Sequence, residues 1–226
     1  VPLGAVPSSS SPGPAGTEVA EVTLSGDAMG TRFVVHLTGP VEDQERMSAA
    51  VHAAFAEARR IEALVNMWSS DSALQQWNLS DAESRSMPRE LALLVELAIG
   101  VHGWTDGALD PTVAIALDEL GFYGAPARVD AAALDPATQD RWSKQLGVER
   151  IQIDWRAGTP PLSMSPLGDW EHTGSLLVVG RELDAARTTS DTVPVTGPML
   201  DLSALAKGYA ADQIVRMLSA ESFTSI

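Results

Sequence analysis

The chain has 226 residues, of which 45% are hydrophobic and 20% charged, so it can fold as a soluble globular protein with one or two domains. Thirty acidic residues against 15 basic ones give a net charge of −15, which argues against nucleic acid or an anionic membrane as a partner. No cysteine is present, so disulfides and thiolate metal sites are excluded.

Residues 1–18 are predicted to be a disordered leader, because Ser, Pro, Gly and Ala dominate this stretch and bury little surface. We expect the folded domain to cover residues 19–226. No signal peptide is recognisable at the start, so any targeting signal is either absent or already removed. No apolar run is long enough to cross a bilayer. Cytoplasm and cell envelope both remain open, since a chain without cysteine fits either.

Two β-rich runs at residues 19–24 and 32–38 predict a pair of strands joined by residues 28–31. The longest helical pattern follows at residues 42–66, where apolar residues recur every three or four positions on one face. The chain therefore begins its domain with a hairpin and a long amphipathic helix.

Residues 67–78 form a polar turn that contains Trp68, followed by a short helix that Asp71 or Ser72 could cap. Trp68 has two interpretations. It either covers the edge of the core or presents a flat face to a planar ligand.

A second helix is predicted over residues 88–104, with Pro88 in its first turn. After it, Asp110 and Pro111 are typical of the N-cap and first position of another helix. Asp110 could therefore be only a cap, and Asp106 only a turn residue.

Residues 130–147 predict a helix interrupted at Asp135 and Pro136, and residues 150–154 alternate like a strand. Residues 155–195 are rich in Pro, Gly, Ser and polar side chains, which indicates an irregular insertion.

Residues 201–212 run from an acidic residue through small residues into a helix with Lys207 on its first turns. The first turn of a helix has unpaired N–H groups and a partial positive charge, so together with a lysine it suits an anionic group such as a phosphate. The alternative is an ordinary amphipathic helix, capped by Asp201 or Ser203, with Lys207 in water.

Several common motifs are absent from the sequence. It contains no Gly-x-Gly-x-x-Gly, Walker, Gly-x-Ser-x-Gly or His-Glu-x-x-His pattern. The usual nucleotide-binding, hydrolase and zinc-enzyme classes therefore lose support.

Four blocks occur in order along the chain, at residues 29–31, 68–78, 105–112 and 201–212. Together they resemble the signatures of the FAD:protein FMN transferases, the ApbE-type flavin transferases, over about residues 28–218. The resemblance implies an α+β fold with mixed β-sheets flanked by helices. It also implies Mg²⁺-dependent transfer of FMN from FAD to a Thr or Ser hydroxyl of an acceptor flavoprotein, with release of AMP. Known acceptors of the family include subunits of ion-translocating respiratory complexes.

The resemblance assigns cofactor contacts to the first three blocks, position by position. Met29 is expected to pack against the flavin, and Trp68 matches the aromatic position that covers the isoalloxazine ring. Ala108, Leu109 and Asp110 match a stretch that contacts FAD, expected at its adenosine end.

In the fourth block, Asp201 and Lys207 match FAD-contacting positions, and the backbone carbonyl of Ala204 matches a metal ligand. The family's pattern continues with a glycine-rich strand, and then with an Asp and a Thr or Ser that complete the metal site. Because the chain stops at Ile226, we expect the C-terminal part of the fold to be missing. No catalytic residue or general base is assigned.

Two other functions remain open. The chain could be a non-catalytic FAD-binding protein, or an FAD pyrophosphatase in which water replaces the acceptor hydroxyl and yields FMN and AMP. Without its chief carboxylate ligand the metal site is weakened, so these 226 residues need not be active by themselves.

Overall fold

The computed structural model describes residues 4–5, 10–12, 18–80, 85–154 and 192–221. The chain divides into two compact units, one formed by Val1–Ala63 with Leu205–Ile226 and the other by Leu64–Ala204. Each unit is described separately below.

A long hairpin forms the sheet of the first unit. Strand β3 (Glu18–Ala28) pairs antiparallel with β4 (Thr31–Pro40) along its whole length. Met29 and Gly30 make the two-residue turn, with φ values of 53° and 67°. A turn with two left-handed residues matches the twist of the flanking strands, which explains the tight connection. The predicted strand pair and its connection are confirmed.

Two short strands pair with β3 on its other side. They are β1 (Gly4–Ala5) and β2 (Ser10–Pro12), both antiparallel to β3. Both lie inside the predicted leader, as does Glu18 at the start of β3, so at these positions the structure has strand where we expected disorder. Main-chain pairing to a strand edge needs no apolar side chain, which is why composition alone did not indicate it. The other residues of the leader lie outside the described residues, and for them disorder stays a prediction.

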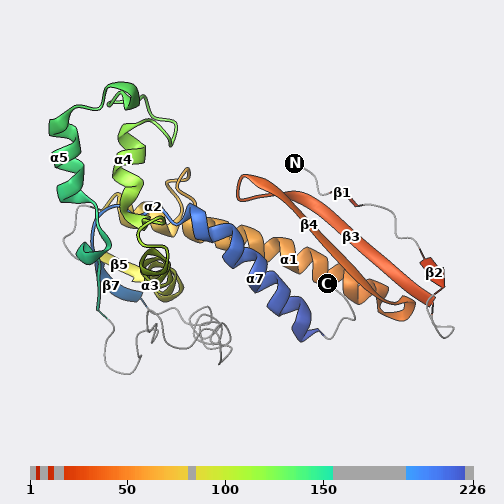
Figure 1. Ribbon diagram of the computed structural model, residues 1–226. Coiled ribbons are helices and arrows are strands. Elements are labelled where there is room, and N and C mark those ends of the chain that lie inside the picture. Colours follow the sequence, from red (N-terminus) through yellow and green to blue (C-terminus); the bar gives the residue numbers. More distant parts are fainter. Residues whose placement is uncertain (1–3, 6–9, 13–17, 81–84, 155–191, 222–226) are drawn as a thin grey trace. The chain divides into compact units, whose positions relative to one another are not determined.

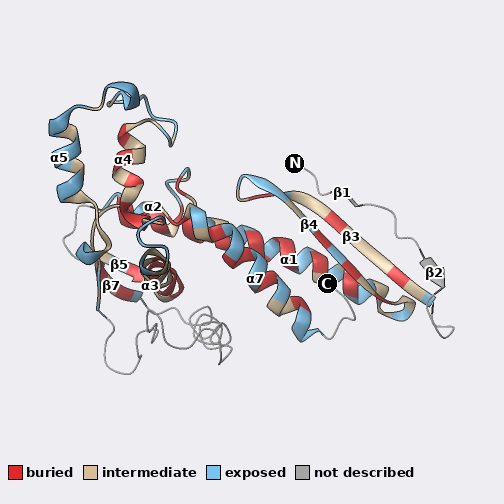
Figure 2. Ribbon diagram, viewed as in Figure 1, coloured by how far each residue is buried: buried red, intermediate tan, exposed pale blue. Residues whose placement is uncertain are grey.

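Most of helices α1 (Gln44–Val65) and α7 (Ser203–Ala220) belongs to the first unit, and a 3₁₀ turn, Val41–Asp43, precedes α1. Buried and exposed residues alternate along both helices (Figure 2). Alternate residues of β3 and β4 point inward and meet the apolar faces of the two helices. The resulting core cluster comprises Ala20, Leu24, Ala28, Val35, Leu37, Met47, Val51, Ala54, Phe55, Ala58, Ile214 and Leu218.

The second unit combines helices with a small sheet (Figure 1). Its helices are α2 (Ala73–Asn78), α3 (Arg89–Trp104), α4 (Ala114–Glu119) and α5 (Pro136–Gln145). Its strands are β5 (Arg85–Pro88), β6 (Gln152–Ile153) and β7 (Thr192–Thr196), in the order β5-β7-β6. Short 3₁₀ turns lie at Pro111–Val113, Ala131–Ala133 and Val148–Arg150. Helix α3 packs against β5 and β7, and its residues Leu91, Leu93, Leu94, Val95 and Ala98 are buried.

The predicted α+β class is confirmed. Every described strand pairing is antiparallel, whereas we expected mixed sheets. Strand β5 was not predicted, and Pro88 ends this strand as the N-cap of α3 instead of lying in the helix's first turn. Within the predicted insertion, residues 192–195 belong to β7, and residues 155–191 lie outside the described residues. None of the helices in the described part of the chain is both long and apolar enough to span a membrane.

Candidate functional site

The loop that contains Trp68 is held by hydrogen bonds at both of its ends. The Asn66 side-chain oxygen accepts from the Trp68 N–H at 2.8 Å, and the Ser72 hydroxyl donates to the Asn66 carbonyl at 2.6 Å. The Ser72 oxygen also accepts from the Gln75 N–H at 3.1 Å and so caps α2. Of the two predicted caps, Ser72 is therefore the one used.

Trp68 lies at the surface in a group of three aromatic rings, which we call the aromatic cluster: Trp68, Phe122 and Tyr123. The Trp68 ring lies 6.0 Å from Phe122 and 5.6 Å from Tyr123, between ring centroids, and meets Tyr123 edge-on at 75°. Trp68 is 57% exposed and Phe122 58% exposed. The indole is thus packed against two rings and more than half exposed, and its role as a face for a planar ligand stays a prediction.

Phe122 and Tyr123 were missed by sequence reasoning. They follow α4 directly after Gly121, whose φ is 78° and where a Cβ would come within 2.8 Å of the Ala125 carbonyl oxygen. A glycine is therefore required at this turn, and it directs the next two residues away from the helix. The signal in the sequence was a pair of aromatic residues flanked by Gly121 and Gly124.

Asp201 is fixed from three directions. Its Oδ2 accepts from the Tyr123 hydroxyl at 2.6 Å, and its Oδ1 accepts from the Ser203 N–H at 2.7 Å. The Asp201 N–H donates to the Pro111 carbonyl at 2.7 Å. Asp201, and not Ser203, therefore supplies the side-chain cap where α7 begins. Burial, and then the neighbouring Asp201 carboxylate, raise the pKa of the Tyr123 phenol above its ordinary value.

The block at residues 105–112 is a tight turn after α3. Asp106 and Gly107 have φ values of 52° and 81°, which reverses the chain. The Thr105 hydroxyl oxygen then accepts from the Leu109 N–H at 3.1 Å, and the His102 Nδ1–H donates to the Leu109 carbonyl at 2.9 Å. Asp106 is thus a turn residue, and Leu109 is held through its backbone while its neighbour Ala108 is exposed.

Asp110 caps the 3₁₀ turn that follows. Its Oδ1 accepts from the Thr112 N–H at 2.8 Å and from the Thr112 hydroxyl at 2.6 Å. The Thr112 oxygen in turn accepts from the Gly147 N–H at 2.8 Å. Asp110 is therefore a cap, as the Asp-Pro pattern predicted, and the carbonyl of the adjacent Pro111 binds Asp201.

Asn78 connects the second block to Leu200, the residue immediately before the fourth block. Its side-chain amide donates to the Leu200 carbonyl at 2.9 Å, and its oxygen accepts from the Leu200 N–H at 2.9 Å. Both residues are buried. Three of the four sequence blocks therefore meet in the second unit, around Asp201.

The remaining predicted site residues lie elsewhere. Met29 belongs to the first unit, is half-buried, and packs against that unit's core cluster. Lys207 is exposed on α7 in the same unit, four residues after Ser203. Ala204, the expected carbonyl ligand, is an exposed residue in the first turn of α7. The contacts around Asp201 described above include none of these three.

Magnesium requires about six oxygen ligands in a near-octahedral arrangement. Among residues 18–80, 85–154 and 192–221 no group of three or more His, Cys, Asp or Glu side chains could hold a metal ion. The described residues therefore do not form a complete Mg²⁺ site.

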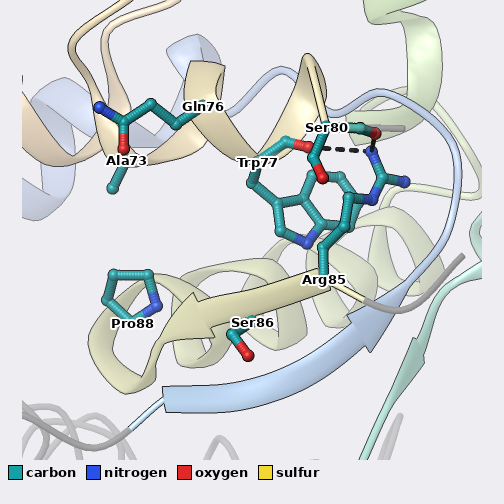
Figure 3. A pocket seen from close by; sticks show the side chains of 7 residues that line it. All are labelled: Ala73, Gln76, Trp77, Ser80, Arg85, Ser86 and Pro88. Atoms are coloured by element: carbon teal, nitrogen blue, oxygen red, sulfur yellow. Dashed lines mark hydrogen bonds between the residues drawn. The ribbon is translucent and has the colours of Figure 1, made fainter. Parts of the chain in front are cut away.

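A pocket of about 350 Å³ lies beside α2 and β5, and none of the predicted site residues lines it (Figure 3). Its lining comprises Ala73, Gln76, Trp77, Ser80, Arg85, Ser86 and Pro88. The Arg85 guanidinium stacks 3.9 Å from the Trp77 ring centroid and donates to the carbonyls of Trp77 at 2.9 Å and Gly197 at 2.7 Å. Burial lowers the pKa of Arg85 from its ordinary value. These contacts make Arg85 a structural connection between α2, β5 and the end of β7.

The chain is 24% identical over 214 residues to the FAD:protein FMN transferase of Klebsiella pneumoniae (strain 342), covering 93% of this chain and 51% of that protein. It therefore spans about half the length of this curated relative.

Two solved structures share the fold. The flavin transferase ApbE of Vibrio cholerae matches with a TM-score of 0.62 and 18% identity, covering 91% of this chain and 55% of the other. The ApbE protein of Thermotoga maritima matches with a TM-score of 0.59 and 19% identity, covering 87% and 52%. The model of the ApbE family matches residues 29–226, which is most of the sequence. This chain belongs to the ApbE family.

Proposed function

We propose that this chain binds FAD and takes part in the transfer of FMN from FAD to a Thr or Ser hydroxyl of an acceptor flavoprotein, with AMP as the leaving group. The observation that supports this most directly is the meeting of three sequence blocks in one unit. Trp68 contacts Tyr123, Tyr123 donates to Asp201, and Asp201 binds the carbonyl of Pro111. Two of these residues, Trp68 and Asp201, are positions to which the family resemblance assigns cofactor contacts.

In this proposal the exposed face of Trp68 stacks on the isoalloxazine ring. More than half of the indole is free, and its ring is held by Tyr123 and Phe122, so it offers a rigid flat surface. Met29 would pack against the flavin from the hairpin turn. Ala108 is exposed and Leu109 is fixed through its backbone, so this turn can contact the adenosine end.

The diphosphate would bind near the start of α7. The partial positive charge at the start of the helix and the exposed Lys207 side chain both favour an anion, although the Ser203 N–H already binds Asp201. Such local donors can act even in a chain with a net charge of −15.

The proposed reaction is a phosphoryl-type transfer. The acceptor hydroxyl oxygen attacks the phosphorus of the FMN half, and the bond from that phosphorus to the bridging oxygen breaks, so that AMP leaves with this oxygen. Positioning and charge neutralisation supply most of the acceleration in such reactions. We propose that Mg²⁺ assists, with the Ala204 carbonyl as one ligand, and we assign no general base. The acceptor would be a flavoprotein, such as a subunit of an ion-translocating respiratory complex.

The reaction is tested by incubating the chain with FAD, Mg²⁺ and a candidate acceptor domain, followed by mass spectrometry. A mass increase of the acceptor by one FMN, together with free AMP, supports the transferase. Free FMN with AMP indicates an FAD pyrophosphatase, and unchanged FAD that remains bound indicates a non-catalytic binding protein. Absence of any FAD binding would contradict the proposal.

The role of Trp68 is tested separately by FAD titration. We expect Trp68→Ala to weaken FAD binding by about 1–3 kcal/mol, the size measured for loss of one stacking face. Leu79→Ala is a matched control, because Leu79 is an exposed apolar residue outside the aromatic cluster. Equal FAD affinity in Trp68→Ala and the control would remove Trp68 from the site.

A further inference from the structure

Tyr123 contacts two residues that the proposed function places at the cofactor. Its ring meets the Trp68 indole edge-on, and its hydroxyl donates to Asp201 Oδ2 at 2.6 Å. We propose that Tyr123 is a positioning residue, which fixes the Asp201 carboxylate relative to the indole so that this carboxylate accepts hydrogen bonds from hydroxyl groups of the bound flavin nucleotide. This inference rests on the proposed function.

The carboxylate is oriented by its two existing hydrogen bonds. Oδ1 is occupied by the Ser203 N–H and Oδ2 by the Tyr123 hydroxyl, so the side chain cannot rotate without losing both. Each carboxylate oxygen has a second lone pair, which remains available to a ligand. An ionised carboxylate only accepts hydrogen bonds and repels phosphate, so its partner on the ligand must be a donor such as a sugar or ribityl hydroxyl.

Tyr123 is suited to be a permanent donor. Its phenol is half-buried and lies against the negative charge of Asp201, and both effects raise its pKa and keep the proton on the oxygen. A hydrogen bond from a neutral donor to a charged acceptor is among the stronger kinds. Tyr123 therefore stays protonated and remains a hydrogen-bond donor to Asp201.

The ring and the hydroxyl of Tyr123 can be separated experimentally. Tyr123→Phe keeps the ring that packs against Trp68 and removes only the bond to Asp201. Asp201→Ala removes the acceptor, and the double variant completes a cycle. Tyr209→Phe is the matched control, since Tyr209 is the only other tyrosine in the sequence.

The first measurement is the unfolding equilibrium, which needs no ligand. We expect Tyr123→Phe to shift the folding equilibrium constant about tenfold in the wild-type background, as for a hydrogen bond to a charged group. In the Asp201→Ala background we expect a shift below about twofold, because the bond is already lost. Equal shifts in the two backgrounds would overturn the inference.

The second measurement is FAD binding by the full chain. We expect Tyr123→Phe to raise the FAD Kd about tenfold in the wild-type background. In the Asp201→Ala background we expect little further loss of FAD affinity. The visible circular dichroism of bound FAD should stay unchanged, because the indole stays in place. Wild-type affinity in Tyr123→Phe, or the same loss in Tyr209→Phe, would contradict the positioning role. If the wild-type chain binds no FAD, the proposed function fails, and the unfolding cycle still decides whether Tyr123 fixes Asp201.

Discussion

The pair of hydrogen bonds between Asn78 and Leu200 offers a sharp test of how the segment before Asp201 is held. The perturbation is Asn78→Leu, which keeps most of the side-chain volume and removes both polar groups. Leu200 is fully buried, and both its N–H and its carbonyl bind the Asn78 side chain at 2.9 Å. The substitution therefore leaves two main-chain groups buried with neither bond.

The magnitude follows from the cost of each unpaired group. A buried polar group that loses its partner costs about 1–3 kcal/mol, so two such groups give a loss of about 2–6 kcal/mol. This is a large part of the 5–15 kcal/mol, roughly, that stabilises an ordinary domain. We expect the variant to be severely destabilised. We also expect Asp201 to lose its fixed position, because Leu200, the residue before it, is no longer held by Asn78.

The assay is urea unfolding followed by circular dichroism, with the midpoint and slope fitted for each variant. Asn66→Ala is the matched control, since Asn66 makes its bond to the Trp68 N–H at an exposed position. We expect the control to lose about 1 kcal/mol or less. A smaller loss for Asn78→Leu than for Asn66→Ala would refute this account of the two buried bonds.

Two further predictions concern Arg85 and Tyr123. Arg85→Lys should lower the free energy of unfolding by about 2 kcal/mol, since an ammonium group cannot reproduce the planar fork that binds the carbonyls of Trp77 and Gly197; urea midpoints equal to wild type would contradict this. For Tyr123 the raised pKa means that the folded protein holds a proton that the unfolded chain releases, so the free energy of unfolding should fall as pH rises above about 10. Unfolding measured between pH 8 and 11 should show a weaker decline in Tyr123→Phe, and an identical decline would refute the assignment.

Much of the fold could be predicted from local pattern. The hairpin followed from two β-rich runs around a short connection, and α1 and α3 followed from apolar residues three or four apart. Strands β5 and β7 were missed because they are short, contain Pro88 and Pro194, and pair with each other across more than one hundred residues. A strand of this kind is defined by its distant partner, and its own sequence gives little signal.

The same distinction applies to the site. Ser72 was one of two predicted caps and a capping role was foreseen for Asp110, because capping depends on residues two or three positions away. Tyr123 received no role, because its hydroxyl binds a residue 78 positions further along the chain. The two bonds of Asn78 span 122 positions. The sequence blocks therefore carried the predicted site residues, but the residues that connect the blocks became visible only in the fold.

The connections around Asp201 also bear on how an acidic chain could hold an anionic cofactor. A carboxylate at the start of α7 would repel a diphosphate if its charge faced the ligand directly. Here the Ser203 N–H and the Tyr123 hydroxyl each donate to one of its oxygens, which disperses that charge and fixes its direction. Lys207 lies four residues after Ser203 on the same helix, with its ammonium group exposed. In our proposal the carboxylate accepts from ligand hydroxyls and the lysine binds phosphate. Lys207→Ala should therefore weaken the binding of ADP as well as that of FAD. Tyr123→Phe should leave the affinity for inorganic pyrophosphate unchanged, as titration of each ligand would show.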